Sequence, residues 1–205
     1  MQPDVFPSAF KSVLGIKGRP FQSQYEDVLL ERVPDSKESR DVIRGWVFRD
    51  SDGRERRSFL DSSRDEQIIF DPVSSQMISL YPETKIATVL RLSTDNQPYF
   101  SALTWRCRVL GLAGELVPEI IAQAEKLGYK TIEGLMCKGY RMVDHSGRLA
   151  TEFWYSDELE GVIQIKSVGE GREYTWRLFN ISRISPDAQV FTVPENYRIQ
   201  LFQDP

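Results

Sequence analysis

The stretch WVFRDSDGRERRSF, residues 46–59, gathers charged side chains that could bind an ion. An EF-hand calcium loop needs oxygen ligands at positions 1, 3 and 5, a glycine at 6 and a glutamate at 12. With Gly53 at position 6, Asp50 and Asp52 fit, but Phe48 and Phe59 fall at positions 1 and 12. Because a phenyl ring cannot bind a hard cation, the spacing argues against a calcium site.

The same stretch is rich in arginine, which could bind phosphate. Its arginines are interleaved with acids, and the whole chain carries 26 basic against 30 acidic side chains, a net charge of −4. Nucleic-acid binders usually present a surface of one sign, so we expect no nucleic-acid partner. An alternating pattern typically indicates a solvated face. The residues concerned are Arg49, Arg54, Arg56 and Arg57 with Asp50, Asp52, Glu55 and Asp61.

A β-hairpin accounts for the stretch without an ion. Gly53 can adopt a positive φ in the connection Asp-Ser-Asp-Gly. Successive side chains alternate between the two faces of a strand. Trp46 and Phe48 therefore share one face and Val47 and Arg49 the other. After the turn, Glu55, Arg57 and Phe59 alternate with Arg54, Arg56 and Ser58.

Catalytic arrangements are sparse. His145, in a turn, is the only histidine, and no G-x-S-x-G motif occurs, which argues against a Ser-His hydrolase. A carboxylate pair remains as a hypothesis. Its most suggestive members are Glu152, Asp157 and Glu158 beside Trp154 and Tyr155, a group typical also of a strand that ends in an acidic turn. The sequence favours a protein that is not an enzyme.

The two cysteines, Cys107 and Cys137, are compatible with a disulfide or with two buried thiols. With a single histidine they cannot complete a zinc site, and they do not form a C-x-x-C redox motif. We predict no metal and no cofactor.

The composition predicts one soluble domain spanning residues 1–205, with residues 1–20 loosely ordered or helical. Apolar residues make up 40% and charged residues 27% of 205. We find no run of 18 apolar residues and expect no transmembrane segment. The amino terminus MQPDVFPSAFKSVLG lacks the pattern of a secretory signal. Either the protein is cytoplasmic, or it is exported and this sequence lacks the signal.

Strand-like runs separated by short polar turns predict an antiparallel meander. Pro82 divides the fifth run. The runs are 21–33, 39–50, 54–61, 66–73, 76–92, 130–134, 136–144, 149–156, 161–168 and 172–184.

One segment has a helical pattern instead. ELVPEIIAQAEKLG, residues 115–128, carries apolar side chains on one face, with Pro118 in the first turn and Gly128 at the C-terminal cap. The pattern predicts one amphipathic helix that packs on the sheet or covers a cavity.

Several motifs occur in the order found in a group of uncharacterised secreted bacterial proteins. RDSDGRERR is followed by IIFDPV, LGYKTIEGLMCKGYR, TEFWYSDEL and RLFNISRISPDAQVFTVPENYRI. The chain resembles this group from Arg49 to Ile199. Its final part is also similar to the end of the periplasmic outer-membrane lipoprotein carriers, the LolA- and LppX-like proteins.

This resemblance implies a strongly curved antiparallel sheet, an incomplete barrel, with the helix covering its concave face. It also implies a periplasmic or secreted protein whose hollow takes acyl chains. The expected partners are a lipid, a lipidated protein or another protein of the cell envelope.

The large apolar side chains of alternate strand positions are the candidate ligand-binding residues. In a curved sheet they line the interior, and a filled core and a ligand-lined hollow show the same alternation. Both interpretations stay open. The candidates are Trp46, Phe48, Trp154, Tyr174, Trp176 and Leu178.

The sequence thus predicts a non-catalytic binding protein or carrier of the cell envelope for an apolar or amphipathic ligand. The alternatives are a structural or protein-interaction module with a filled core and, third, a carboxylate-dependent hydrolase.

Overall fold

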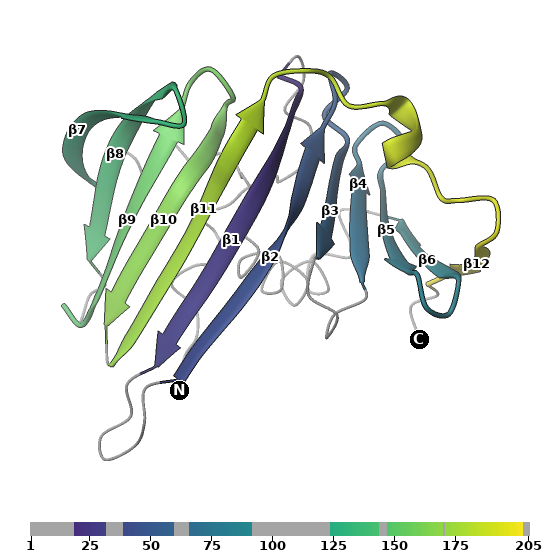
Figure 1. Cartoon of the computed structure of the whole chain (residues 1–205), viewed down its shortest axis with the longest axis horizontal. Coiled ribbons are helices and arrows are strands. Elements are labelled where there is room, and N and C mark those ends of the chain that lie inside the picture. The colour runs from purple at the N-terminus through teal and green to yellow at the C-terminus, as the bar shows by residue number, and fades with distance from the viewer. Residues whose placement is uncertain are drawn as a thin grey trace. The chain divides into compact units, whose positions relative to one another are not determined.

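The computed structural model describes residues 19–31, 39–59, 66–91, 124–143, 147–169 and 171–202; Cys107 and His145 lie outside them. The described residues form twelve strands, and every run predicted as a strand overlaps one, although the run 130–134 covers only the end of β7 (Figure 1). They are β1 (Phe21–Glu31), β2 (Ser39–Arg49), β3 (Glu55–Phe59), β4 (Gln67–Asp71), β5 (Gln76–Tyr81), β6 (Ile86–Arg91), β7 (Glu125–Ile132), β8 (Leu135–Val143), β9 (Leu149–Ser156), β10 (Gly161–Gly169), β11 (Arg172–Ser182) and β12 (Arg198–Leu201).

The strands belong to one sheet that is not closed, in the order β12-β6-β5-β4-β3-β2-β1-β11-β10-β9-β8-β7. The prediction of a mainly β protein is confirmed. Hairpin neighbours such as β4 and β5 pair antiparallel, as the short polar turns require. The last strand departs from the predicted meander, because β12 pairs parallel with β6. The predicted curvature and incomplete barrel stay predictions.

The predicted helix at 115–128 is wrong at its C-terminal end. Residues 115–123 lie outside the described part of the chain, and Glu125–Gly128 belong to β7. Gly128 has a φ of +91° and lies where the register between β7 and β8 shifts by a bulge. The strand's pairing with β8 overrides the helical spacing of its apolar residues. Within the described ranges, the 3-10 helix η2 (Ala188–Phe191) is the only helical element.

Internal contacts divide the chain into two compact units. Of the described residues, unit 1 comprises 26–31, 39–42, 124–143, 147–169 and 171–179, and unit 2 comprises 19–25, 43–59, 66–91 and 180–202. The single domain expected from the composition stays a prediction.

The hairpin predicted for residues 46–59 is present in unit 2. Gly53 has a φ of +82°, and its N–H donates to the carbonyl of Asp50 at 3.2 Å. The Asp50 carboxylate accepts from the backbone N–H of Asp52 at 3.0 Å and from that of Arg54 at 2.9 Å. The tight turn therefore depends on Asp50 as well as on the glycine.

The prediction that the charges of this hairpin form a solvated face is wrong for four of them, since Arg49, Asp50, Glu55 and Arg57 are buried. Arg49, Glu55 and Arg57 lie on the same face as Val47. One Glu55 carboxylate oxygen accepts from Arg49 Nη2 at 3.2 Å, and the other accepts from Arg57 Nη2 at 2.7 Å. The Arg49 guanidinium also lies 4.8 Å from the centre of the Phe21 ring. Mutual pairing is what makes burial of these charges tolerable.

The two arginines set the charge state of Glu55. Burial by itself raises the pKa of this carboxyl, but the attraction and hydrogen bonds of Arg57 and Arg49 outweigh it. The pKa of Glu55 therefore lies below its ordinary value of 4.5, and the group is ionised at neutral pH.

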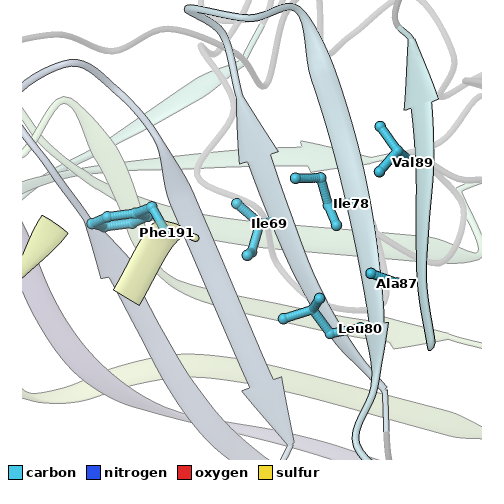
Figure 2. Close-up of a cluster of buried hydrophobic side chains, with 6 residues drawn as sticks. All are labelled: Ile69, Ile78, Leu80, Ala87, Val89 and Phe191. Atoms are coloured by element: carbon cyan, nitrogen blue, oxygen red, sulfur yellow. The ribbon is translucent and has the colours of Figure 1, made fainter. Parts of the chain in front are cut away.

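The opposite face of unit 2 carries an apolar cluster on β4, β5 and β6, which Figure 2 shows together with Phe191 of η2. The segment that contains η2 is held there by Arg56, whose guanidinium donates to the carbonyl of Val190 at 2.7 Å. Both faces of β4 and β5 are buried, which explains their nearly continuous apolar sequence. The cluster consists of Ile69, Ile78, Leu80, Ala87, Val89 and Phe191.

Buried apolar side chains of unit 1 lie on β8, β9, β10 and β11 and in the turn before β10. The Tyr140 and Phe153 rings stack with their centres 5.3 Å apart. Cys137 is a buried free thiol, and burial raises its pKa. The buried apolar residues are Leu135, Cys137, Tyr140, Phe153, Leu159, Val162, Ile163, Trp176 and Leu178.

A search of the described residues finds no helix long and apolar enough to cross a membrane.

Replacing Glu55 tests the buried ion cluster. We expect Glu55→Gln to lower the free energy of unfolding by about 3–5 kcal/mol, because it removes the Glu55 carboxylate from the two buried arginines Arg49 and Arg57. Urea denaturation followed by circular dichroism measures the change. As a matched control, Glu173→Gln removes the half-buried partner of the exposed Lys166 and should cost less than about 1 kcal/mol. Equal effects of the two changes would contradict a special role of the buried cluster.

The lowered pKa of Glu55 also predicts an acid-sensitive contribution to stability. A carboxyl with a depressed folded-state pKa stabilises the fold fully above its unfolded-state value, and this contribution is lost as the pH falls through the folded-state pKa. We therefore expect the free energy of unfolding to drop as the pH falls below about 4.5. Glu55→Gln should change how steeply the free energy of unfolding falls with pH, whereas Glu173→Gln should leave this dependence as it is. If Glu55→Gln does not fold, the milder Glu55→Asp serves in its place.

Candidate functional site

A groove of about 470 Å³ opens on the face of unit 2 opposite the buried ion cluster. Its size lies within the range of roughly 300–1,000 Å³ that is usual for small-molecule sites. Three neighbouring strands supply the lining in the order β2, β1, β11 (Figure 1). The lining residues are Gln22, Trp46, Phe48, Asn180 and Ser182.

The β2 side of the groove is aromatic. Trp46 and Phe48 lie two positions apart, so both project from the same face of the strand. Their rings are stacked, with centres 6.0 Å apart and planes 15° from parallel. Both side chains are half-buried, so each leaves part of its surface to a ligand.

The β11 side of the groove is polar. Asn180 donates from Nδ2 to the Oε1 atom of Gln24 at 2.8 Å, which orients its amide. It has a φ of +53°, a conformation that asparagine tolerates better than most residues. Ser182 accepts from the backbone N–H of Ile184 at 3.3 Å. Gln22 of β1 lies between the aromatic and the polar sides.

Phe48 joins the groove to the apolar cluster of unit 2. It lines the groove and also packs against the buried residues on β4, β5 and β6. Its cross-strand partner Arg56 is engaged with Val190 and with the side chain of Gln67. The aromatic side is therefore anchored on the core.

Three further candidate ligand residues lie on β11 in unit 1. Trp176 and Leu178 are fully buried in the core, and Trp176 Nε1 has no hydrogen-bond partner among the described residues. Tyr174 is half-buried, and its hydroxyl donates to Asp27 at 3.4 Å. These three belong to unit 1 and line no part of the groove. Their role in ligand binding stays a prediction.

Trp154 lies on the face of unit 1 opposite Trp176. It stands across from Gln164, whereas Trp176 stands across from Ile165, and neighbouring positions on a strand point to opposite faces. The Lys130 ammonium lies 3.8 Å from the centre of the Trp154 ring and donates to Gln164 Oε1 at 3.2 Å. Burial lowers the pKa of Lys130, against the opposing effects of Cys137 and Glu152. The structure thus places Trp154 and Trp176 on opposite faces of unit 1.

The acidic residues near Trp154 do not form one site. Glu152 stands in mid-strand across from Arg141 and Lys166. Asp157 is 62% exposed in the following turn and pairs with Lys138 at 2.5 Å. Across the described part of the chain, no group of three His, Cys, Asp or Glu residues could hold a metal ion.

Of the predicted ligand-binding residues, Trp46 and Phe48 line the groove, and their role in ligand binding stays a prediction. The polar side of the groove was not predicted from the sequence. Gln22 and Asn180 stand far apart in the sequence and meet because β1 lies between β2 and β11. The feature of the sequence that could have pointed to the polar side is Asn180, since asparagine is uncommon in the interior of a strand.

The chain matches no family model and no curated protein. Solved structures are similar in fold. An uncharacterized conserved protein from Thermus thermophilus is 10% identical, over 88% of this chain and 91% of that one, with a TM-score of 0.50. A chain of the Pseudomonas aeruginosa MucA/MucB complex is 13% identical over 88% of this chain, with a TM-score of 0.52. The match covers 58% of that chain, less than two thirds of its length.

A LolA superfamily protein from Nitrosomonas europaea is also among the neighbours. It is 12% identical, over 91% of this chain and 93% of that one, with a TM-score of 0.37. For the Thermus thermophilus protein and the MucA/MucB complex, at 10% and 13% identity, the likeness concerns the fold alone.

Proposed function

We propose that this chain is a non-catalytic binding protein or carrier of the cell envelope, periplasmic or secreted, for an apolar or amphipathic ligand such as a lipid or lipoprotein acyl chain. The groove of unit 2 is its binding site. The observation that carries the proposal is the stacked, half-buried pair Trp46 and Phe48 beside three uncharged polar side chains. An apolar surface with a few polar groups is the usual composition of a ligand site.

The two faces of the hairpin support this assignment. One face is committed to the buried ion cluster, and the other presents the aromatic pair. Fold alone does not determine function, so the proposal rests on the groove rather than on the structural neighbours.

A second candidate is a protein-interaction module. It is favoured by one observation: the neighbour MucB has been solved in complex with MucA(peri). In this case an envelope protein, rather than a small ligand, would cover the aromatic pair. A stable complex that buries Trp46 and leaves no small molecule bound would favour this alternative.

Truncating Trp46 tests the carrier assignment. Burial of a large apolar side chain contributes about 1.5–3 kcal/mol, and about 1.4 kcal/mol corresponds to a tenfold change in affinity. We therefore expect Trp46→Ala to lose a co-purifying ligand, or to bind it about tenfold or more weakly. Native mass spectrometry of protein from an envelope fraction, before and after organic extraction, measures occupancy.

Tyr129→Ala is the matched control, because Tyr129 is a 70% exposed aromatic residue in unit 1. It should retain the ligand. Equal occupancy of all three proteins would remove the groove from consideration, and a bare chain in every preparation would argue against the carrier.

A further inference from the structure

The groove of unit 2 has two chemically different sides. The aromatic side consists of Trp46 and Phe48 on β2, and the polar side of Asn180 and Ser182 on β11. Gln22 of β1 stands between them. A ligand that fits both sides must have an apolar surface and, opposite to it, groups that form hydrogen bonds.

The aromatic side favours a ligand with a flat C–H surface. The π face of an aromatic ring is electron-rich, so it attracts the weakly positive hydrogens of C–H groups. Two nearly parallel rings with centres 6.0 Å apart provide a surface longer than one ring. Phe48 is anchored on the apolar cluster, so this surface is held in place before a ligand arrives.

The polar side both donates and accepts hydrogen bonds. Carboxamides and hydroxyls have both capacities, unlike carboxylates or ammonium groups. Ser182 uses an oxygen lone pair for the N–H of Ile184, and its own proton can then be donated to a ligand. Asn180 is oriented by its bond to Gln24. Such a surface suits hydroxyl groups, which likewise donate and accept.

None of the described residues that line the groove is charged. A charged neighbour of the aromatic side, Arg56, stands opposite Phe48 in the strand pairing and is engaged with Val190 and Gln67. A phosphate or carboxylate would lose hydrating water on entering the groove and would meet only neutral groups there. This desolvation costs free energy that no opposite charge offsets. The lining therefore selects for an uncharged ligand.

We propose that the groove binds an uncharged sugar ring. A pyranose has a flat face of C–H groups and an edge of hydroxyl groups, and these match the two sides of the groove. The ring can belong to a free oligosaccharide or to the head of a glycolipid. This inference rests on the proposed function and narrows its amphipathic ligand to a class.

Three probes separate the parts of such a ligand. Maltose offers the neutral sugar alone, dodecyl maltoside adds an acyl-like chain, and dodecylphosphocholine keeps the chain but replaces the sugar by a charged head. Each is titrated into the nitrogen-15-labelled chain below its micelle concentration. The tryptophan indole N–H signals report binding, and the Trp46 signal is identified by its loss in Trp46→Phe.

We expect dodecyl maltoside to shift the Trp46 signal at concentrations at least about tenfold lower than dodecylphosphocholine does. If maltose itself shifts the Trp46 signal, the ligand is a free saccharide. If dodecyl maltoside shifts the signal and maltose does not, the ligand is a glycolipid. If both dodecyl compounds shift Trp46 equally and maltose does not, the sugar assignment is overturned while the carrier function stands. If no probe shifts the Trp46 signal, both the sugar assignment and the carrier function are contradicted.

Asn180→Gly tests the polar side separately. Glycine accepts the positive φ of this position, so the strand is preserved while the amide is removed. Loss of hydrogen bonds to the sugar should weaken the binding of dodecyl maltoside about tenfold and leave the binding of dodecylphosphocholine unchanged. Tyr129→Ala should change neither. An unchanged affinity of Asn180→Gly for dodecyl maltoside would overturn the assignment.

Discussion

The buried carboxylate of Glu55, held between Arg49 and Arg57, is the constraint on which the arrangement of unit 2 depends. Glu55 stands directly across from Arg49 in the pairing of β2 with β3. A slip of one residue would move every side chain of a strand to the other face and would separate these charges. The ion cluster therefore fixes the register of the hairpin. The same register places Trp46 and Phe48 on the opposite face, where the groove lies.

That opposite face serves two purposes. On β4, β5 and β6 it carries the apolar cluster to which Phe191 also belongs (Figure 2). On β1, β2 and the end of β11 it carries the groove. Phe48 belongs to both regions, and Arg56 holds the segment that contains η2. Since a packed core is rigid, this connection pre-organises the aromatic side and reduces the entropy lost on binding.

Much of the fold could be predicted from the sequence, because strands have a strict period of two and their turns are marked by proline, glycine and aspartate. The same period of two also placed Trp46 and Phe48 on one face of the strand and Val47 and Arg49 on the other. It could not tell which face is buried, since the rule that charges are solvated fails where opposite charges pair. The parallel pairing of β12 with β6 and the polar side of the groove depend on residues far apart in the chain, where local patterns carry no information.

The polarity of the groove also bears on the kind of ligand that the proposed carrier would bind. An acyl chain makes no hydrogen bonds, so a site that enclosed only acyl chains would leave Gln22, Asn180 and Ser182 without a partner in the ligand. Buried polar groups that lose water and gain no partner reduce affinity. A neutral amphipathic ligand removes this cost, because its hydroxyl edge replaces the water. The chemistry of five side chains therefore restricts the ligand more closely than a fold shared at 10–13% identity.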